Sequence, residues 1–103
     1  MSVMVEFSVV PIGKGVSLSP VIARILKIVV ESGVHYRVNP MGTVIEGEWD
    51  VVMGVVKKCH HEALSDAERV VTTIKIDDRL GGEIRMDKKL KSLEQALGVH
   101  LKK

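Results

Sequence analysis

The sequence predicts an α+β domain in which two helices cover one face of a four-stranded antiparallel sheet, followed by a short C-terminal helix. Four segments alternate apolar and polar residues with a period of two, and two longer segments between them carry apolar residues at helical spacing. The length of 103 residues leaves room for one hydrophobic core. We therefore expect a single domain over residues 1–103.

The first half of the chain is expected to begin with a strand and a helix. Alternation of apolar residues predicts a strand over residues 3–10, and Pro11 is expected to end it. Ser19 is the predicted N-cap of the helix and Pro20 its first residue, since these residue types favour those positions. Gly33 is expected to end the helix because glycine readily adopts the left-handed conformation found there.

The rest of the chain continues the same patterns. The remaining elements are expected at residues 34–38 (strand), 43–46 (strand), 49–64 (helix), 69–77 (strand) and 87–97 (helix), with a turn at 39–42. The order β-α-β-β-α-β-α is that of a ferredoxin-like βαββαβ sandwich with one added helix. In that topology the first and third strands are central.

One face of the predicted sheet carries no helix, yet it is partly apolar. Met4, Val10 and Val71 fall on this face. An antiparallel sheet left in water normally has a polar outer face, so these residues indicate that another copy of the chain covers them. The sequence therefore predicts self-association.

The composition bounds the class of protein. Hydrophobic residues make up 46% of the sequence and charged residues 27%, which is a globular composition. The net charge of +2 gives no reason by itself to expect a polyanionic partner. One cysteine cannot form an internal disulfide, and no apolar stretch approaches the ~20 residues of a membrane span. We expect a cytoplasmic protein with no membrane partner.

A basic C-terminal segment makes nucleic-acid binding an alternative. Its cations are Arg85, Lys88, Lys89, Lys91, Lys102 and Lys103. RNA-binding modules of this topology stack bases on aromatic residues of the sheet, whereas Phe7 is expected on the helix-covered face. A solvated helix surface is the better interpretation, and we do not expect a nucleic-acid partner.

Two other segments contain residue types used in binding sites. Residues 11–19 lead into a helix N-terminus, where backbone amides favour anions and Lys14 adds charge, but the spacing of a Walker loop is absent. Residues 59–62 read Cys-His-His-Glu, but consecutive helical residues point about 100° apart and cannot converge on one ion. We expect no metal site, no catalytic residue and no cofactor.

Polar residues set among apolar ones on the open sheet face suggest a ligand pocket. Glu6 and Ser8 on the first strand share this face with Thr73 and Lys75 on the fourth. An equally good interpretation is a cross-strand pair between Glu6 and Lys75 at a subunit interface.

Several segments together resemble a known family. They are Asn39-Pro-Met-Gly-Thr-Val-Ile-Glu-Gly47, Trp49-Asp50, residues 73–79 (Thr-Ile-Lys-Ile-Asp-Asp-Arg), Ser32-Gly33, and the single residues Ser8, Pro11, Gly13, Ser17, Ser19 and Tyr36. In these the chain resembles the thiamine-binding-like proteins, small ferredoxin-like proteins of archaea, bacteria and yeast long catalogued as uncharacterised. The resemblance implies dimers that pair as tetramers, binding of thiamine or its hydroxymethylpyrimidine half by some members, and no catalytic activity.

The residues are compatible with such a ligand. An aminopyrimidine needs an apolar slot with hydrogen-bonding groups, and the thiazolium of thiamine needs a counter-charge such as Glu46 or Glu6. A lysine near that cation would repel it unless an acid neutralises the lysine. The candidate ligand-binding residues are Ser8, Tyr36, Asn39, Thr43, Glu46 and Lys75. We therefore expect a non-enzymatic, oligomeric small-molecule binder; a nucleic-acid-associated or regulatory ligand-sensing module of the same fold is the alternative.

Overall fold

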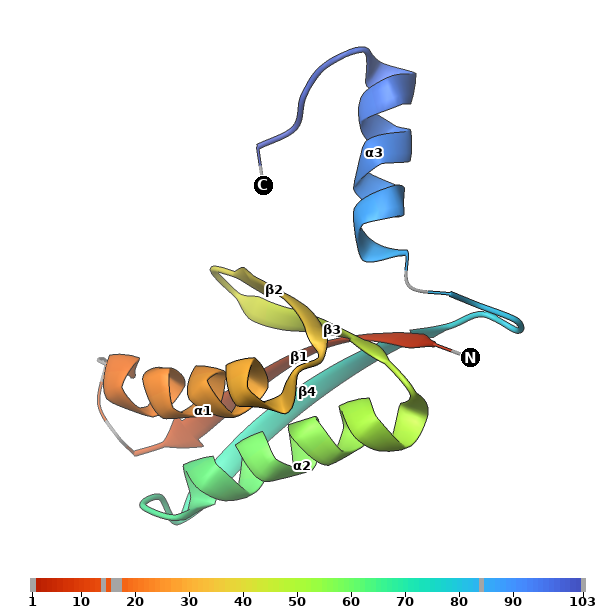
Figure 1. Ribbon diagram of the computed structural model, residues 1–103. Coiled ribbons are helices and arrows are strands. Elements are labelled where there is room, and N and C mark those ends of the chain that lie inside the picture. Colours follow the sequence, from red (N-terminus) through yellow and green to blue (C-terminus); the bar gives the residue numbers. More distant parts are fainter. Residues whose placement is uncertain (1, 14, 16–17, 84, 103) are drawn as a thin grey trace.

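The structure, a computed structural model, describes residues 2–13, 15, 18–83 and 85–102. Its elements are β1 (Val3–Ile12), α1 (Ser19–Ser32), β2 (His35–Asn39), β3 (Gly42–Gly47), α2 (Trp49–Leu64), β4 (Arg69–Asp78) and α3 (Met86–Leu97). The strands form one antiparallel sheet in the order β2-β3-β1-β4, with α1 and α2 on one face (Figure 1). The predicted ferredoxin-like fold, with the first and third strands at the centre, is confirmed.

The hydrophobic core lies between the sheet and the two covering helices. Alternate residues of β1, among them Val5 and Phe7, face this core, as predicted from the period of two. Val29 of α1 and Val52 of α2 are fully buried against them. Arg24 joins the two helices on the outside, because its guanidinium donates to the carboxylates of Glu62 (3.1 Å) and Asp66 (3.0 Å).

The strand β1 extends further than its sequence indicated. Pro11 was expected to end it, but the residue lies inside the strand opposite Val70 of β4, and β1 continues to Ile12. β3 pairs with β1 only from Val3 to Phe7, so beyond Phe7 one side of β1 has no neighbouring strand. Proline lacks a backbone donor, which costs little where a strand has an edge.

Two helix starts also differ from expectation. Ser19 is the first residue of α1 rather than its N-cap, which is Leu18. The last helix, in which Asp87 was expected as the cap, begins at Met86 with Arg85 as its N-cap. Asp87 lies in its first turn, where the positive end of the helix dipole stabilises an acidic side chain.

The helix α3 begins on the sheet face opposite α1 and α2 and rises away from it (Figure 1). Glu46 of β3 lies on that face and is 1% exposed, because its carboxylate accepts hydrogen bonds from the backbone N–H of Arg85 (2.8 Å) and of Met86 (2.6 Å). Arg37 of β2 adds an ion pair with Asp87 (2.6 Å). The radius of gyration of 15.0 Å exceeds the about 13 Å of a compact domain of this length, consistent with a projecting helix.

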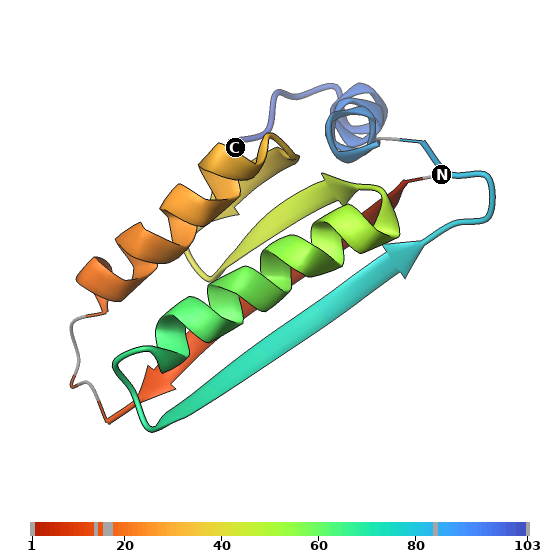
Figure 2. The same cartoon turned by 60° about the horizontal axis from the view of Figure 1, so that its bottom comes forward.

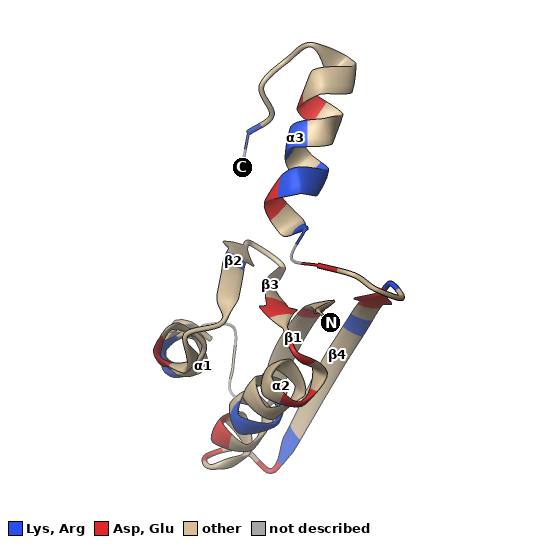
Figure 3. Ribbon diagram, turned by 45° about the vertical axis from the view of Figure 1, so that its right-hand side comes forward, with Lys and Arg blue, Asp and Glu red and all other residues tan. Residues whose placement is uncertain are grey.

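A further set of charges ties the start of α3 to the end of β4. Asp77 pairs with Arg85 (2.6 Å) and with Lys89 (3.1 Å). The hydrogen bond from Lys89, followed by the nearby Arg85 charge, lowers the pKa of the Asp77 carboxyl. Figure 3 shows acidic and basic residues side by side along α3.

The rest of the outer sheet face is open. Val10 is 40% exposed and Val71 is 46% exposed, as the alternation in their strands predicted. Within the described residues, no helix is long and apolar enough to cross a membrane.

The Glu46→Gln variant is expected to lower the free energy of unfolding by about 1–3 kcal/mol. A neutral amide offers one oxygen where the carboxylate offers two, so one of two backbone donors loses its acceptor. Urea unfolding measures the loss, and amide hydrogen exchange at Met86 should accelerate. The exposed Glu68→Gln is the matched control. Unchanged exchange at Met86 would contradict this role of Glu46.

Candidate functional site

A cavity lies between α1 and the turn that joins β2 to β3, at one corner of the sheet. Its volume is about 420 Å³. Its lining residues are Phe7, Ser8, Val9, Val10, Leu18, Ile22, Ile25, Leu26, Val38, Asn39, Pro40, Met41, Gly42 and Thr43. Most are apolar, with three polar side chains, which is the usual composition of a small-molecule pocket of this size.

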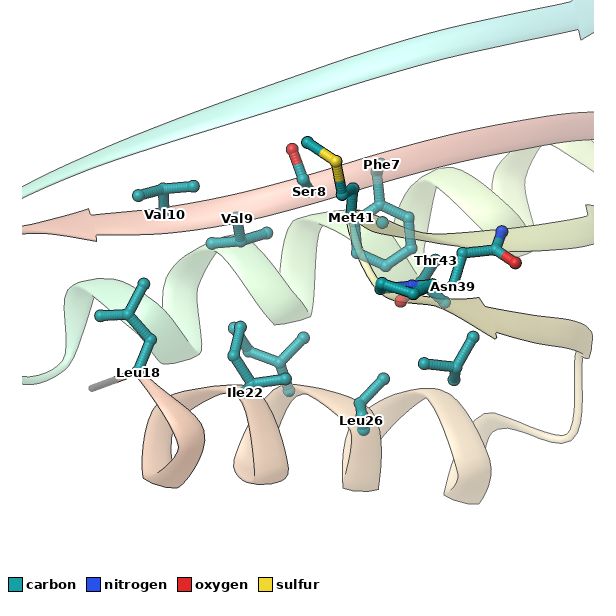
Figure 4. A pocket seen from close by; sticks show the side chains of 14 residues that line it. Phe7, Ser8, Val9, Val10, Leu18, Ile22, Leu26, Asn39, Met41 and Thr43 are labelled. Atoms are coloured by element: carbon teal, nitrogen blue, oxygen red, sulfur yellow. The ribbon is translucent and has the colours of Figure 1, made fainter. Parts of the chain in front are cut away.

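The cavity exists because the β2–β3 hairpin stops halfway along β1. The register pairs Phe7 with Thr43, and the hairpin turns at Pro40 and Met41 just beyond. From Ser8 onward no strand of the described residues continues the sheet on the side of β1 where β3 ends. Figure 4 shows Ile22 and other α1 side chains facing β1 across this gap.

The three polar lining residues come from the hairpin end of the cavity, where the registers place Thr43 on the helix side of the sheet and Ser8 and Asn39 on the outer face. Ser8 comes from β1, Asn39 from the end of β2, and Thr43 from the start of β3. A hydroxyl both donates and accepts hydrogen bonds, and an amide provides one group of each kind. Among the described residues, no charged side chain lines the cavity. The arrangement therefore suits a neutral ring with mixed donors and acceptors.

Gly42 is needed where the hairpin passes close to β1. A Cβ at this position would lie 3.3 Å from the backbone oxygen of Phe7 and 3.6 Å from Cγ of Glu6. A larger residue would push the turn away from β1 and alter the mouth of the cavity.

The three other candidate residues lie elsewhere. Tyr36 is on β2 opposite Ile45, half exposed on the helix side of the sheet, and does not line the cavity. Glu46 is buried under the start of α3, with both carboxylate oxygens bonded to backbone N–H groups. Glu46 therefore does not supply the counter-charge expected of it in the cavity.

Lys75 lies on the outer face of the sheet, where the alternation placed it. Register sets it opposite Glu6, and Ser8 opposite Thr73, so the four polar residues share one face as predicted. They surround a hollow of about 120 Å³ beside Met41. The hollow adjoins the main cavity, because Ser8 and Met41 line both.

The apolar wall supplied by α1 was not among the candidates. Leu18, Ile22 and Leu26 have the helical spacing of core residues, and the sequence pattern gives no sign that they face a cavity. They face a cavity because β3 begins only at Gly42, opposite the middle of β1. That position depends on the register of β3 with β1.

The side chains of the Cys59-His60-His61-Glu62 segment have separate neighbours. Cys59 is fully buried with its thiol against the backbone oxygen of Ile25 (3.7 Å), and His60 contacts the hydroxyl of Thr72 (2.6 Å). In the described part of the chain, no group of three metal-ligating side chains is close enough to hold an ion. Burial raises the pKa of the Cys59 thiol to about 11, which disfavours the nucleophilic thiolate.

Two other segments were considered as binding sites, the loop over residues 11–19 and the basic C-terminal segment. Lys14 and Ser17 of the loop lie outside the described residues. In the C-terminal segment, Arg85 and Lys89 pair with Asp77, and Lys88 pairs with Glu83. These carboxylates offset the positive charge that a polyanion would need.

Comparison with known proteins now identifies the family. The sequence model described as thiamine-binding protein matches residues 5–94. The chain belongs to this family. The resemblance carried by the Asn39–Gly47 segment is thereby confirmed.

Members of the family with similar sequences occur in archaea and bacteria. The UPF0045 protein MJ1052 of Methanocaldococcus jannaschii is 35% identical over 91 residues, covering 88% of this chain and 91% of that protein. The UPF0045 protein sll0230 of Synechocystis is 37% identical over 95 residues, covering 91% and 78%.

Solved structures of the family share the fold. The crystal structure of MJ1052 superposes with a TM-score of 0.84 at 34% identity, covering 91% of this chain and 97% of that one. A Thermotoga maritima protein proposed to act in thiamine biosynthesis or salvage superposes with a TM-score of 0.79 at 30% identity, covering 90% and 99%.

Cys59 should react with a thiol reagent far more slowly in the folded protein than in urea. Its pKa of about 11, against 9.0 for an ordinary thiol, lowers the thiolate fraction at pH 8 about a hundredfold, and burial adds a barrier to access. The rate in the folded protein should keep rising, about tenfold per pH unit, up to about pH 11, whereas the rate of an ordinary thiol levels off near pH 9. Labelling with a chromogenic disulfide measures both rates; equal rates would contradict the burial.

Proposed function

We propose that this protein is a non-enzymatic, self-associating binder of a small neutral heteroaromatic ring, and that the ligand is hydroxymethylpyrimidine or thiamine held by its pyrimidine half. The observation that carries the proposal is the apolar cavity of about 420 Å³ with hydroxyl and amide groups at one end. Membership of the thiamine-binding protein family and the thiamine-related role proposed for the Thermotoga maritima relative support the choice of ring.

The shape and chemistry of the cavity favour the pyrimidine half over the thiazolium half. A flat aminopyrimidine can lie between the side chains of α1 and β1 and reach the hydroxyl of Thr43, while Ser8 and Asn39, on the other face of the sheet, border the rim of the cavity. A cation placed among these apolar side chains would lose its hydration without gaining a counter-charge.

A thiazolium ring, when present, would be better placed at the mouth of the cavity. The side chain of Glu6 lies beside Gly42, which lines the cavity, and is itself exposed. Its carboxylate can therefore face a cation that stays partly in water. Lys75 lies opposite Glu6 in the register, so the charge of a bound cation would compete with that of Lys75 for the Glu6 carboxylate.

Binding without catalysis is proposed because the cavity lacks an activated group. Ser8 and Thr43 are the hydroxyls at its lining, and the described lining residues include no histidine, carboxylate or lysine that could act as a base.

Self-association into a dimer or tetramer is proposed because apolar residues remain exposed on the outer face. Val10 and Val71 lie on adjacent strands and face each other in register. Burying such surface against a second copy stabilises by roughly 25 cal/mol per Å².

Calorimetric titration tests the ligand. Hydroxymethylpyrimidine and thiamine should bind, whereas thiamine diphosphate should bind no more tightly than thiamine, because the described residues that line the cavity include no cation for its phosphates. Ile22→Trp should weaken binding at least tenfold, since Ile22 lines the cavity and a larger side chain fills it.

The matched control is Val30→Trp, a change of similar size on the same helix at a position that does not line the cavity. This variant should bind like the parent protein. Absence of heat with all three compounds would overturn the ligand, and equal binding by both tryptophan variants would overturn the location.

A further inference from the structure

The second half of β1 has one open edge, and this edge borders the cavity. β4 pairs with β1 along its whole length, whereas β3 reaches only as far as Phe7. Figure 2 shows the β2–β3 hairpin turning part-way along β1 while β4 continues beside it. Beyond Phe7, no strand of the described residues bonds to the backbone groups on this side of β1, and Val9 lies there as part of the cavity lining.

The hairpin determines which way each backbone group of β1 points. In an antiparallel pair the N–H and C=O of one residue point to the same side, and successive residues alternate sides. The two-residue turn closes on Asn39 and Gly42, which pair with each other. The groups of the next residue, Thr43, therefore point away from β2 and to β1. Thr43 lies opposite Phe7, so the backbone groups of Phe7 point to β3.

Two further features agree with this direction. The backbone oxygen of Phe7 lies 3.3 Å from the place that a Cβ of Gly42 would take, so it faces the hairpin. Pro11 shares the direction of Phe7 by alternation, and its missing N–H therefore removes no bond to β4. Val9, between the two, must direct its N–H and C=O to the open edge and into the cavity. Among the described residues, no hydrogen bond outside the sheet involves either group.

These main-chain groups matter because the side chains leave the cavity poor in polar contacts. Ser8 and Asn39 lie on the outer face of the sheet, so Thr43 provides the one lining hydroxyl on the helix side among the described residues. Val9 is 4% exposed and adds a donor and an acceptor side by side. Shielded backbone groups without a partner are costly, so this edge favours a ligand that satisfies both at once.

The chemistry of that ligand follows from what a neighbouring strand would supply. A residue paired with Val9 would accept a hydrogen bond from its N–H and donate one to its C=O. A ring nitrogen with an adjacent amino group presents the same acceptor and donor along one edge of a flat heteroaromatic ring. Such a ring can continue the plane of the sheet, with Ile22 of α1 against one of its faces.

We propose that the main chain of Val9 recognises the ligand, its N–H donating to a ring nitrogen and its C=O accepting from the adjacent amino group. The ring then takes the place of the strand residue that β3 does not provide. This inference rests on the proposed function and deepens it, because it defines the ligand class as rings that carry an amino group next to a ring nitrogen. Hydroxymethylpyrimidine and the pyrimidine half of thiamine belong to that class.

Amide hydrogen exchange tests the open edge without any ligand. The N–H groups of Ser8 and Val10 point to β4 and bond to it, whereas that of Val9 has no strand to bond to. The Val9 amide should therefore exchange about a hundredfold faster than those of Ser8 and Val10. Equal protection of all three amides would overturn the direction assigned to Val9.

NMR on the complex tests the contact itself. With ¹⁵N-labelled protein and ¹⁵N-labelled hydroxymethylpyrimidine, a coupling across the N–H···N hydrogen bond should join the amide nitrogen of Val9 to a ring nitrogen. A coupling from a different amide would overturn the assignment. The analogue in which hydrogen replaces the amino group should bind about tenfold more weakly, because the C=O of Val9 then has no donor.

A pair of variants at position 9 separates the N–H from the side chain. Val9→Pro and Val9→Ala both shorten a buried side chain, but only the proline removes the N–H. Calorimetry should show about tenfold weaker binding of hydroxymethylpyrimidine by Val9→Pro than by Val9→Ala. If Val9→Pro does not fold, the coupling and the analogue decide on the parent protein.

The outcomes distinguish this inference from the proposed function. Binding by the parent protein without a coupling to Val9, or equal binding of the ring with and without its amino group, overturns the main-chain contact and leaves the ligand and the cavity standing. Absence of binding by the parent protein overturns both.

Discussion

The short reach of the β2–β3 hairpin is the constraint from which the candidate site follows. β1 and β4 are each ten residues long and pair along their whole length, whereas β3 pairs with β1 only as far as Phe7. Because the hairpin turns at Pro40 and Met41, the second half of β1 has no β3 residue beside it, and the side chains of α1 face the space that β3 would have filled. Side chains that would otherwise pack on a third strand line a cavity instead. Gly42 allows the turn to lie against β1 at this point.

The second organising contact is the burial of Glu46 under α3. A buried carboxylate is costly unless its oxygens are hydrogen-bonded, and here two backbone donors at the start of a helix supply the bonds. The contact fixes where α3 leaves the sheet and keeps Glu46 out of the cavity. The cavity and α3 therefore lie at opposite ends of the hairpin: its turn borders the cavity, while the end of β3 holds α3.

Periodicity predicted the order and nearly all boundaries of the elements, because one face of each strand and helix packs on the core. It failed at Pro11 because this part of β1 pairs with β4 but not with β3. A proline, which has no backbone N–H, is tolerated in a strand that has a neighbour on one side only. It could not reveal the cavity, because Ile22 and Leu26 have the same spacing as core residues. Nor could it foresee that Glu46 would be covered by a helix that begins 40 residues later. Both depend on register and on contacts between distant segments.

The most direct test of the central claim, that a neutral heteroaromatic ring binds between α1 and the hairpin turn, is a two-dimensional ¹H–¹⁵N NMR titration with hydroxymethylpyrimidine. The account predicts that amide shifts concentrate at cavity residues, with Ile22, Leu26 and Gly42 among the largest. Amides of Lys75 and of α3 should move little. Shifts confined to α3 or to the Lys75 hollow, or no shifts at millimolar ligand, would contradict it.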